Sequence, residues 1–169
     1  MSDFLSEVEN CIPSLRRYAV ALLRDRYQAD DLVQDCLERA IRKRSLWRRT
    51  GSMRCWLFTI MHNIHISQIR KSDRQPNTVE FETVAHEIHT RDGPGQGDWT
   101  HDIAFCLSQL PEPQRRVILL VALEGFSYKE TSQMLQVPEG TVMSRLSRAR
   151  EQLRKMMEGE VMPKLKVVK

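Results

Sequence analysis

Five polar residues near the end of the chain have side chains and a spacing suited to binding nucleic acid. They are Thr141, Ser144, Arg145, Arg148 and Lys155. At 3.6 residues per turn, Arg145 lies on the flank of a helical face that the other four share. An arginine can hydrogen-bond both acceptors of a guanine edge, which gives about 1–3 kcal/mol of discrimination, and any of the five can hold a phosphate. The stretch predicts either a DNA-reading helix or an amphipathic helix whose basic face is only solvated.

The residues before this stretch indicate a helix-turn-helix. Ser127 and Glu130, three residues apart, form a capping box that marks the start of a short helix. The pair Val137-Pro138 ends that helix, because a residue before proline is driven out of helical geometry. A longer helix then covers about residues 139–157. Its inward-facing residues at helical spacing are Val142, Leu146, Ala149 and Leu153. A short helix, a tight turn and a longer helix are the layout that sets a recognition helix into the DNA major groove.

Three segments of this part of the chain resemble a known family. They are LPEPQRRV at residues 110–117, EGFSYKE at 124–130 and GTVMSRLSRAR at 140–150, which are similar to region 4 of the extracytoplasmic-function group of bacterial sigma factors. The resemblance implies a domain that reads the upstream, minus-thirty-five promoter element. Two residues depart from the family pattern. Ser132 stands where alanine is usual, and Gln136 stands where glycine is common, which costs about 1 kcal/mol if that turn needs a positive φ.

A second set of polar residues gathers on another predicted helix. Asp31, Gln34, Asp35 and Glu38 lie on one face, opposite an apolar arc. A compact acidic and amide surface suits a basic helical partner, although a simply solvated face is the alternative. The surrounding sequence DDLVQDCLERA, residues 30–40, resembles region 2 of the same family. The resemblance implies that this face docks on the clamp helices of the largest subunit of RNA polymerase, and that the core enzyme's flap is a further contact.

A basic loop with aromatic and apolar residues follows, over residues 42–54. The stretch WLFTIMHN at residues 56–63 resembles the family's helix beside the minus-ten element. The resemblance implies that the basic loop before this helix traps a flipped base of that element. Cations can track the phosphate backbone while an aromatic or apolar pocket accepts an unstacked base. Trp56 and Phe58 are expected in the core rather than on DNA. The residues predicted to bind the minus-ten region are Arg44, Trp47, Arg48, Arg49 and Arg54.

These sites require a two-domain, all-α protein. Apolar residues at helical spacing predict helices around Leu15–Leu22 and Leu32–Ala40, a third over residues 52–71, and two more over residues 103–110 and 113–124. We expect a domain at residues 1–74 and another at 101–169, joined by a flexible acidic linker at 75–100 that contains a Gly-Pro cluster. The resemblance implies that this linker threads the polymerase cleft as a nucleic-acid mimic, and plain solvation of a tether explains its acids equally well.

Composition excludes several other classes of protein. No stretch approaches the roughly 20 apolar residues of a membrane span, and acids rather than bases open the chain, so we expect a cytoplasmic protein. The scattered cysteines, Cys11, Cys36, Cys55 and Cys106, are expected to be small apolar fillers, with a thiol switch as the alternative. Cys55, His62 and His65 have no fourth ligand at suitable spacing, so we expect no metal, no cofactor and no enzymatic activity.

The sequence therefore predicts a sigma factor that binds RNA polymerase core, recognises and melts promoters, and directs transcription initiation. Its expected partners are the core enzyme, promoter DNA and, from the resemblance, an anti-sigma factor. A stand-alone helix-turn-helix regulator is one alternative, but it leaves residues 30–40 without a role. A sigma-like mimic that sequesters an anti-sigma factor is the other. Such a mimic has less reason to keep Arg145, Arg148 and the basic loop.

Overall fold

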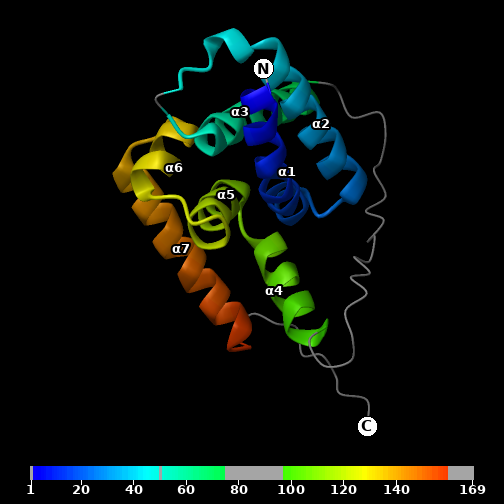
Figure 1. The fold of residues 1–169 in the computed structure, drawn as a ribbon. Helices are drawn as coiled ribbons and strands as arrows, with labels where there is room; N and C mark the ends of the chain where they lie inside the picture. The colour runs from blue at the N-terminus through cyan, green and yellow to red at the C-terminus, as the bar shows by residue number, and fades with distance from the viewer. Residues whose placement is uncertain (1, 50, 75–96, 160–169) are drawn as a thin grey trace. The chain divides into compact units, whose positions relative to one another are not determined.

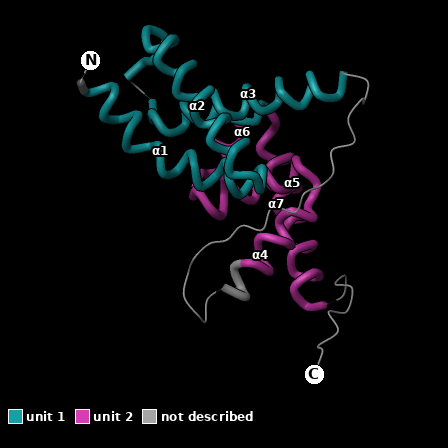
Figure 2. Tube along the Cα trace, turned by 90° about the vertical axis from the view of Figure 1, so that its right-hand side faces the viewer, with its two compact units in different colours: residues 1–88, 133–136 teal, residues 89–132, 137–169 magenta. Residues whose placement is uncertain are grey.

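The computed structural model describes residues 2–49, 51–74 and 97–159. Within these ranges the regular structure is helical and no strand occurs, which confirms the predicted all-α class (Figure 1). Two compact units are present, one comprising residues 1–88 and 133–136 and the other residues 89–132 and 137–169 (Figure 2). The predicted acidic linker lies almost entirely outside the described residues. No described helix is long and apolar enough to cross a membrane.

Three helices that pack on one another form the first unit. They are α1 (Ser2–Leu23), α2 (Arg26–Arg42) and α3 (Met53–Arg74), with a single 3-10 turn, η1 (Arg44–Leu46), after α2. The apolar arcs expected in α1 and α2 are buried, except that Leu37 is only half-buried. Tyr18 of α1 meets Phe58 of α3 edge to face, with ring centroids 5.3 Å apart. The Cys36 thiol of α2 donates a hydrogen bond to the Leu57 carbonyl of α3 at 3.3 Å.

The connection between α1 and α2 is shorter than expected. The polar residues at 25–28 of the sequence indicate a short connection, but α2 already begins at Arg26. Asp25 is the cause, because its carboxylate accepts hydrogen bonds from the backbone N–H groups of Tyr27 at 2.8 Å and Gln28 at 3.1 Å. Such an N-cap satisfies donors that have no partner inside the helix. A single residue, Arg24, stands between the end of α1 at Leu23 and the Asp25 cap. Its φ of 57° lies in the left-handed region.

The second unit contains α4 (Gly97–Gln109), α5 (Glu112–Ile118), a π-helical turn η2 (Leu119–Leu123), the first part of α6 (Tyr128–Leu135), up to Ser132, and α7 (Glu139–Met157). The helix predicted at 103–110 starts earlier, at Gly97. The helix predicted at 113–124 is found, but its last turn is π-helical, with the Glu124 N–H bonded to the Leu119 carbonyl at 3.0 Å. Both α4 and α5 pack against α7, so they are the platform on which α7 lies.

Arg115 fastens α4 to the start of α5. Its guanidinium donates to the carbonyls of Leu107, Ser108 and Leu110 at 3.0, 2.8 and 2.9 Å. These carbonyls belong to the end of α4 and the break that follows, where helical partners run out. A cation at the C-terminus of a helix is also favoured by the helix dipole. The break before α5 is therefore fixed by a side chain that no local pattern identifies.

Candidate functional site

The predicted capping box is present at the start of the helix-turn-helix. The Glu130 N–H donates to the Ser127 hydroxyl at 3.1 Å, and the Ser127 N–H donates to the Glu130 carboxylate at 2.8 Å. Two backbone donors at the start of α6 are thereby satisfied. Such reciprocal caps contribute about 1 kcal/mol to a helix. The short first helix of the motif is thus specified locally.

The turn between α6 and α7 has a positive φ at Gln136, the geometry in which the lack of a glycine there carries a cost. Gln136 has a φ of 54°, in the left-handed region that glycine occupies without strain. A side chain there costs about 1 kcal/mol. Ser132, the other departure from the family pattern, donates its hydroxyl to the Val137 carbonyl at 2.6 Å, directly across this turn. The two departures therefore lie at the same structural feature.

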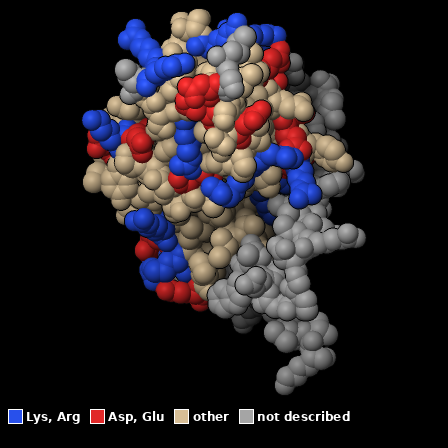
Figure 3. Space-filling view, viewed as in Figure 1, with Lys and Arg blue, Asp and Glu red and all other residues tan. Residues whose placement is uncertain are grey.

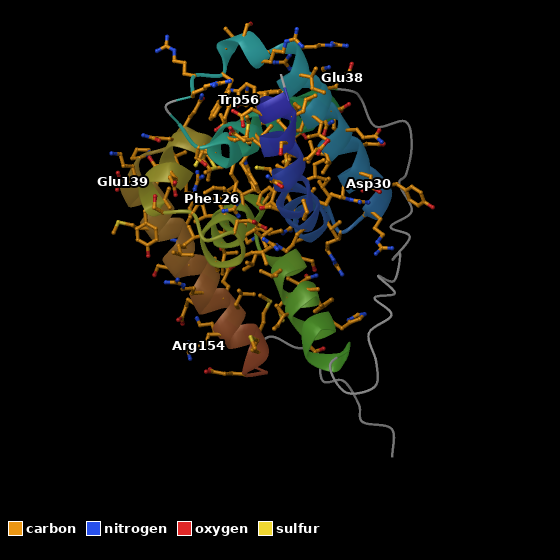
Figure 4. The ribbon with its side chains drawn as sticks, viewed as in Figure 1. Asp30, Glu38, Trp56, Phe126, Glu139 and Arg154 are labelled. Carbon is orange, nitrogen blue, oxygen red and sulfur yellow. The ribbon has the colours of Figure 1, made fainter. Side chains whose placement is uncertain are left out.

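The helix α7 presents the predicted polar face outward. Val142, Leu146 and Ala149 are buried against the platform, whereas Leu153 is half-buried. Figure 4 labels Glu139 at the start of this helix and Arg154 toward its end. The five residues predicted to contact DNA divide by exposure. Ser144, Arg148 and Lys155 are exposed, and Thr141 and Arg145 are half-buried.

The end of α7 carries an ion-pair network that the sequence did not single out. The Arg154 guanidinium hydrogen-bonds Glu151 and Glu158, each at 2.8 Å in the shorter contact, and the Lys155 ammonium lies 3.8 Å from Glu151. The hydrogen bonds from Arg154 hold the pKa of the Glu151 carboxyl below its usual value. Lys155 is thus partly engaged with an acid. Arg148, three residues before Glu151, is exposed and makes no ion pair within the described part of the chain, so it is the more available cation on this helix.

A shallow groove of about 490 Å³ lies beside α7, on a different side from the predicted DNA face. It is formed by the start of α6 and by one flank of α7. Its lining residues are Tyr128, Met143, Leu146, Ser147, Arg150, Glu151 and Arg154. Sequence reasoning missed this groove, because Tyr128 and the other lining residues come from two different helices.

The acidic face of α2 is also exposed as predicted. Asp31, Gln34, Asp35 and Glu38 all face solvent, opposite the buried arc. Figure 4 labels Glu38 toward the end of α2 and Asp30 near its start. Glu38 pairs with Arg42 one turn on. Asp30 differs from its neighbour Asp31, since it accepts a hydrogen bond from Arg16 of α1 at 3.0 Å and so helps to join the two helices.

The basic segment after α2 combines exposed cations with an aromatic cluster. Arg44, Arg48 and Arg49 are exposed, and Figure 3 shows basic side chains gathered at the top of the view, where Figure 1 places the end of α2 and η1. The half-buried Trp47 ring lies 5.4 Å from that of Trp56, whose ring in turn meets Phe4 at 6.3 Å. The cluster consists of Phe4, Trp47 and Trp56. Beside it in the sequence, Leu46 is 66% exposed.

Arg54 differs from the other predicted minus-ten residues. It lies in the first turn of α3 rather than in a loop, and its guanidinium donates to the Ser14 hydroxyl of α1 at 3.0 and 3.1 Å. The same group stands 5.5 Å from the centre of the Phe58 ring, a cation–π distance. Arg54 therefore holds α3 on α1. Phe58 is buried, as expected, whereas Trp56 is only half-buried.

Two of the four cysteines, Cys36 and Cys106, have the environment of fillers rather than of reactive thiols, whereas Cys11 and Cys55 are half-buried. Cys36 and Cys106 are buried, and burial raises the pKa of the Cys36 thiol to about 12. Burial also raises the pKa of Cys106 and of Cys11. His65 is buried and His62 half-buried on α3. In residues 2–49, 51–74 and 97–159, no three acidic, histidine or cysteine side chains come together as a metal site.

Two family models match the chain. The model described as the Sigma2 domain of PhyR matches residues 8–62, and the model described as Sigma-70, region 4 matches residues 100–153. The first match covers α2 with its acidic face and the segment that carries Trp47. The second covers α4 to α7 through Leu153.

Curated relatives match most of the chain. The ECF RNA polymerase sigma factor EcfG of Rhodopseudomonas palustris is 35% identical over 144 residues, which span 84% of this chain and 78% of that protein. The ECF RNA polymerase sigma factor SigM of Mycobacterium tuberculosis is 32% identical over 143 residues, or 85% of this chain and 71% of the relative.

Solved structures show the same fold. The sigma factor RpoE from Bartonella quintana, in complex with the anti-sigma factor NepR, superimposes with a TM-score of 0.80 at 33% identity, covering 95% of this chain and 99% of that one. The PhyRSL–NepR complex from Sphingomonas sp. Fr1 gives 0.67 at 21% identity, over 94% of this chain and 92% of the other, and this likeness is one of fold alone.

Proposed function

This chain belongs to the extracytoplasmic-function group of RNA polymerase sigma factors, and from that premise we propose which of its surfaces makes each contact that a sigma factor needs. As a sigma factor it binds core RNA polymerase and directs transcription initiation at promoters. We assign core binding and the minus-ten element to residues 1–74, and the minus-thirty-five element to residues 101–169. Its site of action is the cytoplasm, where the polymerase works.

The exposed face of α2 is the proposed docking surface for core polymerase. Asp31, Gln34, Asp35 and Glu38 project from a helix whose other side is buried, so the face is rigid before binding. Preorganisation lowers the entropy cost of association. Carboxylates and an amide at this spacing complement the basic side chains of a paired-helix partner. We expect charge reversal here to weaken core binding without unfolding α2.

The segment from Arg44 to Arg49 is the proposed contact with melted minus-ten DNA. Arg44, Arg48 and Arg49 can neutralise phosphates, and the Trp47–Trp56 pair with exposed Leu46 offers an apolar surface to an unstacked base. Strand opening would be driven by this binding energy. Arg54 supports the surface from behind, because it holds the start of α3 against α1.

The outer face of α7 is the proposed reader of the minus-thirty-five element. Arg148 and Ser144 are exposed near the start and middle of a recognition helix, with Arg145 and Thr141 beside them. The observation that carries the proposal is this union in one chain of an exposed basic recognition helix with an exposed acidic docking face. A stand-alone regulator needs only the first of these.

We also propose control by an anti-sigma factor of the NepR type. The support is the likeness to RpoE of Bartonella quintana, whose solved structure is a complex with NepR. A sigma-like mimic is the second candidate, because the first segment matches the Sigma2 domain of PhyR. The DNA-facing arginines favour the sigma factor, and so does the identity of 33% with RpoE against 21% with PhyRSL.

Run-off transcription with sigma-free core polymerase tests the proposal. The template is a sequenced genomic promoter library, and the variants are Asp35→Arg for core docking and Arg148→Ala for the upstream element. Matched controls are Glu9→Arg on the exposed side of α1 and Arg150→Ala on another side of α7. We expect Asp35→Arg to weaken core binding. Arg148→Ala should lower transcription about 5- to 100-fold on promoters with the shared upstream motif, while both controls stay active.

Two outcomes would contradict the proposal. Absence of core binding by the folded wild-type chain, together with tight binding to a NepR-type protein, would identify a mimic. Specific promoter binding by the chain alone, unaffected by Asp35→Arg, would identify a stand-alone regulator.

A further inference from the structure

We propose that Ser132 is a positioning residue for the recognition helix: by holding the carbonyl of Val137, its hydroxyl fixes the turn from which α7 starts and so sets affinity for the upstream promoter element. The proposal rests on the assignment of α7 as the reader of that element. It concerns a half-buried residue of α6 that lies outside the predicted DNA-reading face.

Ser132 binds both main-chain groups of Val137. Its hydroxyl donates to the Val137 carbonyl at 2.6 Å, and its own carbonyl accepts from the Val137 N–H at 3.2 Å. Both peptide groups that flank the Val137 side chain are therefore tied to one residue of α6. A residue held in this way cannot rotate about φ or ψ without breaking one of the two bonds.

The residue before Val137 makes this bond necessary. Gln136 is exposed and holds a φ of 54°, a conformation that L-residues with a side chain adopt at a cost. Without a restraint, the backbone at Gln136 would gain by relaxing toward negative φ, and the direction of the following chain would change. The hydrogen bond from Ser132 opposes that relaxation. With glycine at this position, no such restraint would be needed.

The start of α7 depends on the turn. Its N-cap is Pro138, which follows Val137 directly and whose side chain can neither donate nor accept a hydrogen bond. The Pro138 carbonyl accepts from the N–H groups of Thr141 and Val142 at 3.0 and 3.2 Å, which joins the turn directly to the first turn of α7. Residues 138–140 are exposed, and burial of α7 begins only at Val142. The first turn of the helix is therefore aimed by the Ser132–Val137 bond.

A change in the direction of the first turn of α7 should weaken hydrogen bonds to base edges before it destabilises the fold. Thr141, Ser144 and Arg145 lie in the first two turns of α7, next to the turn. Hydrogen bonds to base edges require placement to within about 0.5 Å. The buried residues Val142, Leu146 and Ala149 still hold the helix on the platform when its start is loosened. We therefore expect a loss of promoter affinity with little loss of helix content.

The test uses the reconstituted holoenzyme and five chains: wild type, Ser132→Ala, Ser132→Thr, Gln136→Gly and the double variant Ser132→Ala with Gln136→Gly. The probes are the strongest promoter recovered from the genomic library and the same promoter with its upstream element scrambled. We expect Ser132→Ala to lower transcription about 3- to 10-fold on the intact promoter. It should leave the scrambled promoter and core affinity unchanged. Gln136→Gly should restore most of the activity in the double variant, and Ser132→Thr, which keeps the hydroxyl, should stay close to wild type.

Three results would overturn the proposal. These are full activity of Ser132→Ala on the intact promoter, an equal loss on the scrambled one, and a double variant as weak as Ser132→Ala. A different result marks failure of the parent assignment, namely a wild-type holoenzyme that transcribes both promoters equally. In that case α7 does not read the upstream element at all.

Discussion

Replacing Arg115 with methionine should loosen the second unit while leaving the first unit unchanged. The guanidinium makes three hydrogen bonds of 2.8–3.0 Å to the carbonyls of Leu107, Ser108 and Leu110. A hydrogen bond to a charged group contributes about 1.5–3 kcal/mol. The three bonds share one half-buried group, and water can reach part of the vacated site, so their contributions do not add. We expect a total loss of about 2–3 kcal/mol.

Hydrogen exchange of the intact chain, followed by mass spectrometry of its peptides, measures this loss where it occurs. A loss of this size corresponds to about 30- to 150-fold faster exchange. We expect that acceleration in peptides of α4 and α5 and of α7, which packs on both. Peptides of α1 to α3 are the internal control, and Arg150→Met, on an exposed arginine of α7, is the matched control. Arg115→Lys should recover about half of the loss, because an ammonium keeps the charge but lacks the planar fork of donors that the guanidinium offers to the three carbonyls.

The reasoning fails if exchange in α4 and α5 is unchanged in Arg115→Met. It also fails if α1 to α3 accelerate to the same extent, since the effect would then not be local. Equal acceleration in Arg150→Met would show that loss of any arginine produces it.

Two further predictions concern buried polar groups. The Thr131 hydroxyl is fully buried with no hydrogen-bond partner in the described structure, so Thr131→Val should raise the free energy of unfolding by about 1 kcal/mol, and a lower melting temperature would contradict this. Burial raises the pKa of Cys36 from 9.0 to about 12, which cuts its thiolate fraction at pH 8 about a thousandfold. Iodoacetamide with peptide mapping should therefore label Cys36 only in urea. Fast labelling of Cys36 in the native chain would contradict a buried thiol with a raised pKa. The raised pKa of Cys36 stabilises the native state below pH 9, and this stabilisation should be lost between pH 9 and about 12.

Local patterns in the sequence determined where the helices lie and which faces they bury. The capping box of Ser127 and Glu130 is read from four consecutive residues, because both of its hydrogen bonds close within one turn. The break at Pro138 is equally local. The exposed face of Asp31 and Asp35 follows from the 3.6-residue period, since a helix that buries one arc must expose the opposite one. The sequence did not predict whether the turn at Gln136 has a positive φ, and the structure shows that it does.

The tertiary structure alone decided which polar side chains are available for partners. Arg54 and Arg49 are alike in sequence, yet Arg54 is half-buried and bonds Ser14, 40 positions away, whereas Arg49 stays exposed, with its guanidinium 3.9 Å from Asp3. Asp30 and Asp31 are neighbours, yet only Asp30 pairs with Arg16 on another helix. The three carbonyls bound by Arg115 and the bond from Ser132 across its turn are likewise invisible to periodicity. Helical periodicity and capping hydrogen bonds act within about one turn of a helix. The contacts of Arg54, Asp30, Arg115 and Ser132 depend instead on how helices pack on one another or on the turn between two helices.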